Sequence, residues 1–310
     1  MLEKLATLDR RWLFLVMAIA IIVPLLVPVS LPFEASPPVR ATYDAVEALR
    51  PGQTVLLSID YDPAARPEVE PWARAVLRHL LRRRVKIVMM TLWDKAPPIV
   101  RSLINEIVLG EYNQRRGYFA PDQPGGRLAQ DYAPYRYGED YVFLGYKDGK
   151  EIVIAGMGQN LRQMFPVAEA EREGGDKIPV ARIPVLSGIS SLRDFALILE
   201  ASAGFPGAKE YVQQVVTRYR LRFAAATTAV SVTDLSPYYP EQMLGLIGGM
   251  RGSAEYEQLV EAPGLGTSGL NVLTFGQIFV ILAIVLGNVI FFLQRRLRPR
   301  SSPGAGGGVG

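Results

Sequence analysis

The sequence predicts a Rossmann-like, three-layer α/β domain with a mainly parallel sheet, flanked by an N-terminal and a C-terminal transmembrane helix. Two long apolar segments, 12–33 and 272–293, lie near the ends of the 310-residue chain. Between them, short continuous apolar runs alternate with amphipathic segments, a rhythm typical of parallel strands covered by helices on both faces. The chain contains no cysteine, which excludes a disulfide scaffold.

The two apolar segments are long enough to span a membrane, because roughly 20 residues cross the hydrocarbon core. Basic residues, which tend to stay in the cytoplasm, flank their outer ends. They are Lys4, Arg10, Arg11, Arg295, Arg296, Arg298 and Arg300. We therefore expect cytoplasmic termini (1–11 and 294–310) and an extracytoplasmic central domain. A cleaved signal peptide is the alternative for segment 12–33, but its apolar stretch exceeds the usual length of about 7–15 residues.

Within segment 272–293, Ala283 and Gly287 have the spacing of small residues that allows close helix packing. Asn288 follows directly, and its amide can hydrogen-bond to a neighbouring helix. One interpretation is a helix that packs against segment 12–33 or another subunit. The other is that Asn288 lies near the membrane interface and faces water.

The charge distribution argues against a nucleic-acid-binding protein. The chain has 34 basic and 30 acidic residues. The basic excess belongs to the membrane flanks, and the central part is close to neutral. Nucleic-acid binding needs a basic face on the folded domain, so no nucleic-acid partner is expected.

The central domain is predicted over 54–261, between linkers 34–53 and 262–271. Its first half reads as a strand, a helix and a second strand, the βαβ unit of parallel sheets. The expected strands are Thr54–Asp60, Val85–Thr91, Tyr141–Tyr146, Phe195–Ala201 and Phe223–Val230, and the expected helices are 67–84, 98–110, 160–165, 208–221 and 240–260. Residues 151–155 are expected to be extended, either in a hairpin with Tyr141–Tyr146 or in the same strand after an excursion.

Segment 111–140 interrupts this rhythm with many tyrosines and arginines. Long excursions from compact domains are usually functional or disordered, and Tyr and Arg are enriched at protein interfaces. We predict a contact arm, with a self-packed surface loop as the alternative. The candidate interface residues are Tyr112, Arg115, Arg116, Tyr118, Phe119, Tyr135 and Tyr137.

Four glycines, Gly245, Gly248, Gly249 and Gly252, fall in the last predicted helix. Each costs about 0.8–1 kcal/mol relative to alanine inside a helix. The helix must therefore break there or gain a close packing contact. We predict close packing against another backbone, such as that of a neighbouring copy.

The carboxyl ends of the first two strands carry the strongest catalytic candidates, because ligands of open α/β sheets bind beyond those ends. The segment Ser58–Asp62 resembles the nucleophile motif of haloacid-dehalogenase-type phosphatases, an apolar strand followed by Asp-x-Asp. The resemblance implies that Asp60 is the nucleophile, Asp62 the acid/base and Thr91 a phosphate ligand. Two family features are missing, since Lys177 is poorly placed and no acidic pair ends the strand at 223–230. A strand-end turn capped by aspartates is the alternative.

Gly156 and Gly158 are weak cofactor candidates, because Gly-Met-Gly is expected to follow a strand and open a short helix, similar to a dinucleotide fingerprint. The third glycine is replaced by Leu161, so a plain strand-to-helix turn is the other interpretation. With no cysteine, and with the single histidine, His79, in the middle of a predicted helix, the sequence offers no His/Cys metal cluster and no ordinary Ser-His-Asp arrangement. A carboxylate-only metal site and a Ser–Lys pair are the alternatives that stay open. No metal and no cofactor are predicted.

The lack of a complete catalytic set, together with two anchors, favours a structural or accessory subunit of a membrane complex, not an enzyme. Its expected partners are the lipid bilayer and other membrane subunits or copies of itself. The layout distantly resembles auxiliary proteins of gliding-motility-type ABC transport systems, without a shared motif. The alternatives are a membrane-anchored, phosphatase-like hydrolase and an extracytoplasmic small-ligand sensor.

Overall fold

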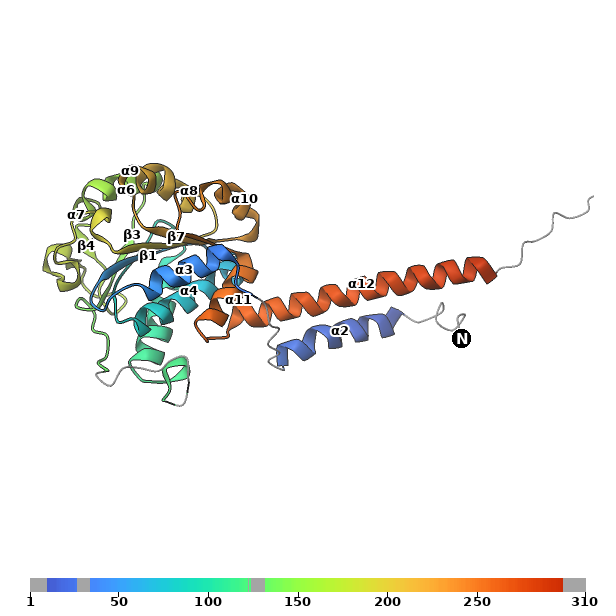
Figure 1. Ribbon diagram of the computed structural model, residues 1–310. Helices are drawn as coiled ribbons and strands as arrows, with labels where there is room; N and C mark the ends of the chain where they lie inside the picture. Colours follow the sequence, from blue (N-terminus) through green and yellow to red (C-terminus); the bar gives the residue numbers. More distant parts are fainter. Residues whose placement is uncertain (1–9, 27–33, 122, 124–131, 298–310) are drawn as a thin grey trace, which may run out of the picture. The chain divides into compact units, whose positions relative to one another are not determined.

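The computed structural model describes residues 10–26, 34–121, 123 and 132–297 (Figure 1). The chain divides into two compact units. One is the domain Pro32–Gly269, and the other combines Met1–Leu31 with Leu270–Gly310.

The domain is built on a six-stranded sheet in which every neighbouring pair is parallel. Its strands are β1 (Thr54–Asp60), β2 (Lys86–Thr91), β3 (Tyr141–Tyr146), β6 (Leu197–Ser202), β7 (Phe223–Thr227) and β8 (Gly245–Gly248). Their spatial order is β3-β2-β1-β6-β7-β8, which is the order of the doubly wound Rossmann fold. The predicted Rossmann-like parallel sheet is thus confirmed, and its strand order reverses between β1 and β6.

Helices cover both faces of this sheet (Figure 1). One face carries α3 (Pro37–Glu47), α4 (Arg66–Arg82), α5 (Pro97–Leu103) with its π-helical continuation Ile104–Tyr112, and α11 (Gly249–Leu259). The other carries α6 (Lys150–Gln159), α7 (Leu161–Met164), the continuous helix made of α8 (Ala208–Tyr211), a π-helical stretch (Val212–Val216) and α9 (Thr217–Tyr219), and α10 (Val232–Leu235). A small antiparallel pair, β4 (Val167–Ala168) and β5 (Ile178–Pro179), lies near β3.

Two separate hydrophobic cores result, one on each face. Alternate residues of β1 enter different cores: Leu57 packs in the core below α4, and Leu56 in the core below α6. This explains why the strands are continuous apolar runs, since both faces of each strand are buried.

Several predicted elements are corrected by the structure. Residues 151–155 are helical within α6, because Val153, Ile154 and Met157 turn one helix face toward the sheet. The expected linker 34–53 contains helix α3, whose Val39, Thr42 and Val46 are buried. The helix expected at 240–260 is strand β8 followed by α11. The expected linker 262–271 contains the start of α12, at Leu265.

The second unit contains α2 (Arg10–Leu26) and most of α12 (Leu265–Leu297). Among the described residues, one helical stretch, Leu265–Leu293, is long and apolar enough to cross a membrane, with a mean hydropathy of 2.5. The apolar helix Arg11–Leu26 is shorter than a span, and residues 27–33 of the first predicted span lie outside the described residues. The described residues therefore contain one candidate span where two were predicted.

The predicted packing residues of α12 lie on its C-terminal half. Asn288 uses its amide inside the helix, where Nδ2 donates to the carbonyl oxygen of Ile284 at 3.0 Å. A side chain added at Gly287 would meet no other atom within 4 Å.

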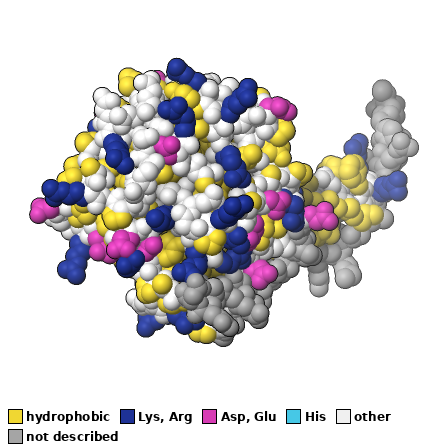
Figure 2. All heavy atoms as spheres, turned by 60° about the vertical axis from the view of Figure 1, so that its left-hand side comes forward, with side chains coloured by type: hydrophobic (Ala, Val, Ile, Leu, Met, Phe, Trp, Pro, Cys, Tyr) yellow, Lys and Arg dark blue, Asp and Glu magenta, His cyan; other side chains and the backbone are white. Residues whose placement is uncertain are grey.

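On the face of the molecule in Figure 2, basic side chains are scattered and acidic ones lie among them. This matches the near balance of charge in the central part of the sequence.

Candidate functional site

Asp60, at the carboxyl end of β1, is fully buried and joins β1 to β2. Its Oδ1 accepts hydrogen bonds from the Leu92 backbone N–H at 2.6 Å and from the Thr91 hydroxyl at 3.3 Å. The Ser58 hydroxyl donates to Oδ2. Thr91 is also fully buried. The structure thus brings Asp60 and Thr91 together, but inside the domain.

Asp62 takes part in a different set of contacts. Its Oδ1 accepts from the backbone N–H groups of Ala64 at 3.1 Å and Ala65 at 3.3 Å, in the turn that leads to α4. This is the strand-end turn capped by an aspartate that the sequence offered as the alternative. A carboxylate nucleophile must be reachable by its substrate, and Asp60 has no exposed surface.

Glu200 is the residue that sequence reasoning did not single out. It lies on β6 directly beside Ser58 of β1, so the two side chains share one face of the sheet. Glu200 is fully buried, and a side-chain hydrogen bond with Ser202 is what opposes the rise of its pKa. The available signal was a single acidic residue inside the apolar run 195–201.

The two carboxyl groups are held away from water on the same side of the sheet. Burial raises the pKa of Asp60 to about 7, against the opposing hydrogen bonds from Leu92, Ser58 and Thr91. Burial also raises the pKa of Glu200 well above its usual range, and the charge of Asp60 raises it further. Tyr211 of α8 is also linked to these buried side chains, because its hydroxyl donates to Ser58 Oγ at 3.1 Å.

A cavity of about 310 Å³ opens at the carboxyl ends of β6 and β7. The strand-end hydroxyls of Ser202 and Thr227 lie in its wall, together with charged, aromatic and small residues. The remaining lining residues are Gly204, Phe205, Lys209, Glu210, Ser231, Asp234 and Leu235.

The start of α8 lies at this cavity, and its first N–H groups are already bound. Glu210 accepts from the Gly207 N–H at 2.8 Å, and Ser202 Oγ accepts from the Ala208 N–H at 3.3 Å. A Cβ at Gly207 would lie 2.3 Å from the Gly204 carbonyl oxygen, so this tight loop requires glycine.

The two cofactor candidates do not form a phosphate-binding loop. Gly156 and Gly158 lie inside α6, not in a strand-to-helix turn. A Cβ on Gly156 would lie 2.5 Å from Met164 Sδ, and one on Gly158 would lie 2.8 Å from Val215 Cγ1. These glycines allow α6 to pack closely against the two neighbouring helices.

The described part of segment 111–140 packs largely on its own domain. The rings of Tyr112 and Phe119 are 4.9 Å apart, those of Tyr112 and Tyr135 are 5.0 Å apart, and all three residues are buried. Tyr118 donates to the Val260 carbonyl at 2.7 Å, and Tyr137 to that of Glu169 at 2.6 Å.

Arg115 and Arg116 are the exposed candidates of this segment. The guanidinium of Arg115 lies 5.0 Å from the centre of the Tyr132 ring. Residues 122 and 124–131 of the predicted arm lie outside the described residues.

The glycine-rich segment makes the predicted close backbone approach, but to its own chain. A Cβ on Gly245 would lie 1.9 Å from Thr42 Oγ1 and 2.6 Å from the Pro38 carbonyl oxygen, both in α3. Gly248 ends β8, Gly249 has a φ of +55° at the strand-to-helix turn, and Gly252 packs on Ile247.

Both ends of the domain are held by helix α11. Where the chain enters, the Ser36 N–H and hydroxyl donate to Glu255 Oε2, at 2.9 and 2.5 Å. Where the chain leaves, Glu257 accepts from the N–H groups of Gly264, Gly266 and Thr267 at 2.8–3.0 Å, and from the Thr267 hydroxyl at 2.7 Å. Glu257 therefore caps the first turn of α12, and both carboxylates are buried.

His79 of α4 links α11 to α3 inside the domain. Its Nδ1 lies 2.9 Å from the Tyr256 hydroxyl of α11, and its Nε2 lies 3.0 Å from Glu47 Oε1 of α3. Burial lowers the pKa of His79 to about 4. The hydrogen bond from His79 is the main cause that lowers the pKa of Glu47 to about 2. A neutral imidazole that donates to a carboxylate and accepts from a tyrosine is a structural link between helices.

Comparisons with known proteins do not place this chain in a family. No protein-family model matches it, and no curated protein matches it. An α,α-trehalose-6-phosphate synthase from Burkholderia multivorans is 13% identical, with a TM-score of 0.32 over 93% of this chain and 50% of that one. A UDP-forming α,α-trehalose-phosphate synthase from Burkholderia vietnamiensis is 13% identical, with a TM-score of 0.29 over 86% and 52%. This chain spans about half the length of these proteins.

Proposed function

We propose that this protein is a membrane-anchored accessory subunit whose α/β domain acts by binding a partner within a membrane complex. The observation that carries the proposal is the junction at α11, where Glu255 holds the entering chain and Glu257 holds the leaving chain. A domain whose two ends are fixed on one helix suits anchoring by the segments that precede and follow it.

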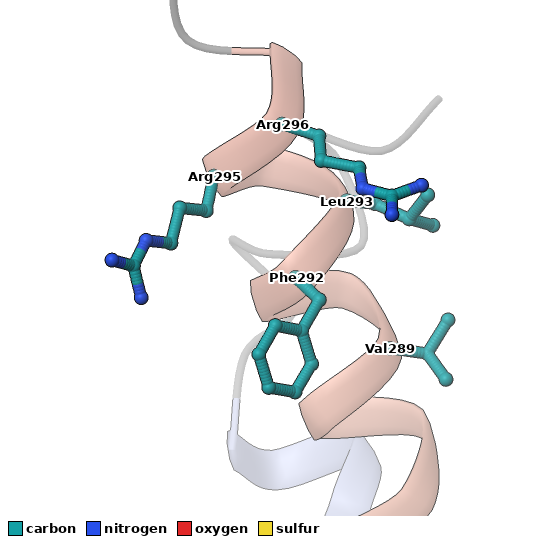
Figure 3. Close-up of a pocket in the computed structure, with 5 residues that line it drawn as sticks. All are labelled: Val289, Phe292, Leu293, Arg295 and Arg296. Atoms are coloured by element: carbon teal, nitrogen blue, oxygen red, sulfur yellow. The ribbon is translucent and has the colours of Figure 1, made fainter.

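The arginines after the apolar stretch support a membrane boundary at the end of α12. Figure 3 shows Arg295 and Arg296 extending from the last turns of this helix, next to Val289, Phe292 and Leu293. Arginine side chains at the end of an apolar helix reach the polar surface of a bilayer, and basic flanks stay in the cytoplasm. The proposed topology has both termini inside, two anchoring segments and the domain outside.

The burial of the catalytic candidates supports binding over hydrolysis. The phosphatase resemblance requires Asp60 to attack a phosphate, but Asp60 and Thr91 are enclosed and Asp62 caps a turn. The geometry therefore offers no acid, base and nucleophile around one open space at this point.

Single-cysteine labelling tests the topology, because the natural chain has no cysteine. We expect a membrane-impermeant maleimide to label Asp148→Cys in intact cells, because Asp148 lies in the exposed turn after β3. It should label Ser301→Cys only after the cells are opened. The reverse pattern would place the domain in the cytoplasm.

Native mass spectrometry after gentle detergent extraction tests whether the protein is bound to a partner. We expect a species heavier than one chain. A lone chain with phosphatase activity that is abolished by Asp60→Asn would contradict the proposal.

The junction itself can be tested with Glu257→Ala. The substitution leaves the buried N–H group of Gly266 and the partly buried N–H group of Thr267 without their acceptor, and a buried group that loses its acceptor costs about 1–3 kcal/mol. We expect the melting temperature of the detergent-solubilised protein to fall by several degrees. Glu241→Ala, at an exposed glutamate, is the matched control and should leave the melting temperature unchanged. Equal melting of both variants would show that Glu257 does not hold the start of α12.

A further inference from the structure

Exposed arginines surround Tyr219 at the amino ends of β6 and β7. The guanidinium carbons of Arg193 and Arg218 lie 5.3 and 5.4 Å from the centre of the Tyr219 ring. Arg222 directly precedes β7, and its Nη1 donates to the Ala196 carbonyl, just before β6, at 3.5 Å. All three arginines are exposed. Together with Tyr219 they form what we call the arginine cluster.

The half-buried ring of Tyr219 is held in place by α6. A Cβ at Gly158 would lie 2.7 Å from Tyr219 Cε2, so the ring occupies the room that a side chain at Gly158 would fill. Aromatic rings attract guanidinium groups. A fixed ring therefore positions two of the arginines before any partner arrives.

The positive charges of the arginine cluster are not balanced by ion pairs. In the described part of the chain, its arginines pair with no carboxylate and donate only to the neutral oxygens of Ser191 and Ala196. Asp194, in the loop before β6, accepts from serine N–H and hydroxyl groups of that loop. Glu241 lines a separate cavity with Arg220. Uncompensated like charges held close together attract an anion from outside.

The composition of the arginine cluster suits a protein partner that carries carboxylates. A planar guanidinium group binds a carboxylate through two parallel hydrogen bonds. Tyr and Arg are also enriched among the residues that dominate the energy of protein interfaces. Nucleic acid needs a basic face on the folded domain, whereas acidic side chains lie among the basic ones on the face in Figure 2.

We propose that the arginine cluster is a docking surface for an acidic segment of a partner protein, with Arg193 and Arg218 bound to its carboxylates. The inference rests on the proposed function, which it deepens by naming the surface and the chemistry of the partner. The docking surface lies at the edge of the sheet opposite to the carboxyl ends of the strands.

Calorimetric titration of the full chain tests this surface with hexaglutamate as the probe. The chain is placed in nanodiscs of anionic phospholipid, so that lipid phosphates surround the arginines at the end of α12 and the peptide meets the domain. At low ionic strength we expect hexaglutamate to bind with a dissociation constant of about 1 mM or below. Neutral hexaglutamine should not bind.

The double variant Arg193→Gln with Arg218→Gln should weaken binding of hexaglutamate about tenfold or more, because its charge-assisted hydrogen bonds are lost. Both arginines are exposed, so the variant should fold, and its melting curve checks that. Arg40→Gln with Arg172→Gln, at two exposed arginines outside the cluster, is the matched control and should bind as the natural protein does.

Three results of the titration would overturn the proposal. They are no binding of hexaglutamate at about 10 mM, unchanged binding by the cluster variant, and tighter binding of a single-stranded DNA of the same charge that is lost in the same variant.

Native mass spectrometry separates a failure of this inference from a failure of the proposed function. We expect the natural protein and the control variant to be heavier than one chain, and the cluster variant to be a lone chain. If the cluster variant stays bound, the arginine cluster is not the docking surface, but the accessory role stands. If the natural protein itself is a lone chain, the accessory role fails, and the titration decides whether the cluster binds carboxylates.

Discussion

Gly245→Ala is expected to destabilise the α/β domain by about 3 kcal/mol or more, because the new methyl group has no room. Its carbon would lie 1.9 Å from Thr42 Oγ1 and 2.6 Å from the Pro38 carbonyl oxygen. The second of these atoms belongs to the backbone, so α3 as a whole has to move away from β8. For a domain of this size, such a loss lowers the melting temperature by about 6–12 °C.

Gly204→Ala is the control for this experiment, because its added carbon would meet Trp93 at an ordinary contact distance of 3.7 Å. It should melt within a degree or so of the natural protein. Thr42→Ala added to Gly245→Ala should restore only part of the loss, since the contact with Pro38 remains. If Gly245→Ala melts normally, α3 does not pack on β8 as described.

Replacing Glu200 by glutamine is expected to stabilise the domain above neutral pH, and the more so the higher the pH. The pKa of Glu200 is raised in the folded protein, so the folded state holds its proton at a pH where the unfolded chain has lost it. The stability that depends on this proton is complete below about pH 4.5, the ordinary pKa range of the group, and is lost as the pH rises above it. A glutamine has no proton to lose.

The stability that depends on the proton of Asp60 is also lost as the pH rises, between the ordinary pKa of 3.8 and the folded pKa of about 7. His79 acts in the opposite direction, because its pKa is lowered from 6.5 to about 4, and stability from this group grows as the pH rises between these values. Glu47, with a pKa lowered to about 2, loses its contribution only as the pH falls below about 4.5. The pH dependence of the stability of the natural protein therefore combines the titration of several groups.

The difference between Glu200→Gln and the natural protein isolates the buried acid. Thermal melting from about pH 4.5 to pH 8 should show a gap in favour of the variant that widens with pH. Glu241→Gln, at an exposed acid, is the control, and its melting temperature should follow that of the natural protein at every pH. Melting temperatures of Glu200→Gln that stay parallel to those of the natural protein would mean that burial does not raise the pKa of Glu200 in the folded domain.

The sequence by itself determined the class of the domain, most of its strands and the apolar character of its ends. A run such as Val55–Leu57 is apolar at every position because both faces of a central parallel strand are buried, and that pattern is local. The stretch 151–155 was misassigned because a short apolar run has no period that separates a strand from a buried helix.

Contacts between distant segments decided the rest. Gly245–Gly248 is a strand because β7 pairs with it and α3 packs on its bare backbone. Glu200 meets the acidic end of β1 only because the sheet places β6 beside β1, about 140 residues apart in the chain. Likewise, α11 joins the entrance and exit of the domain through Glu255 and Glu257, which no local pattern marks. Burial and hydrogen bonding between remote residues depend on the packed fold, so the burial of Asp60 beside Glu200 and the junction could be found only there.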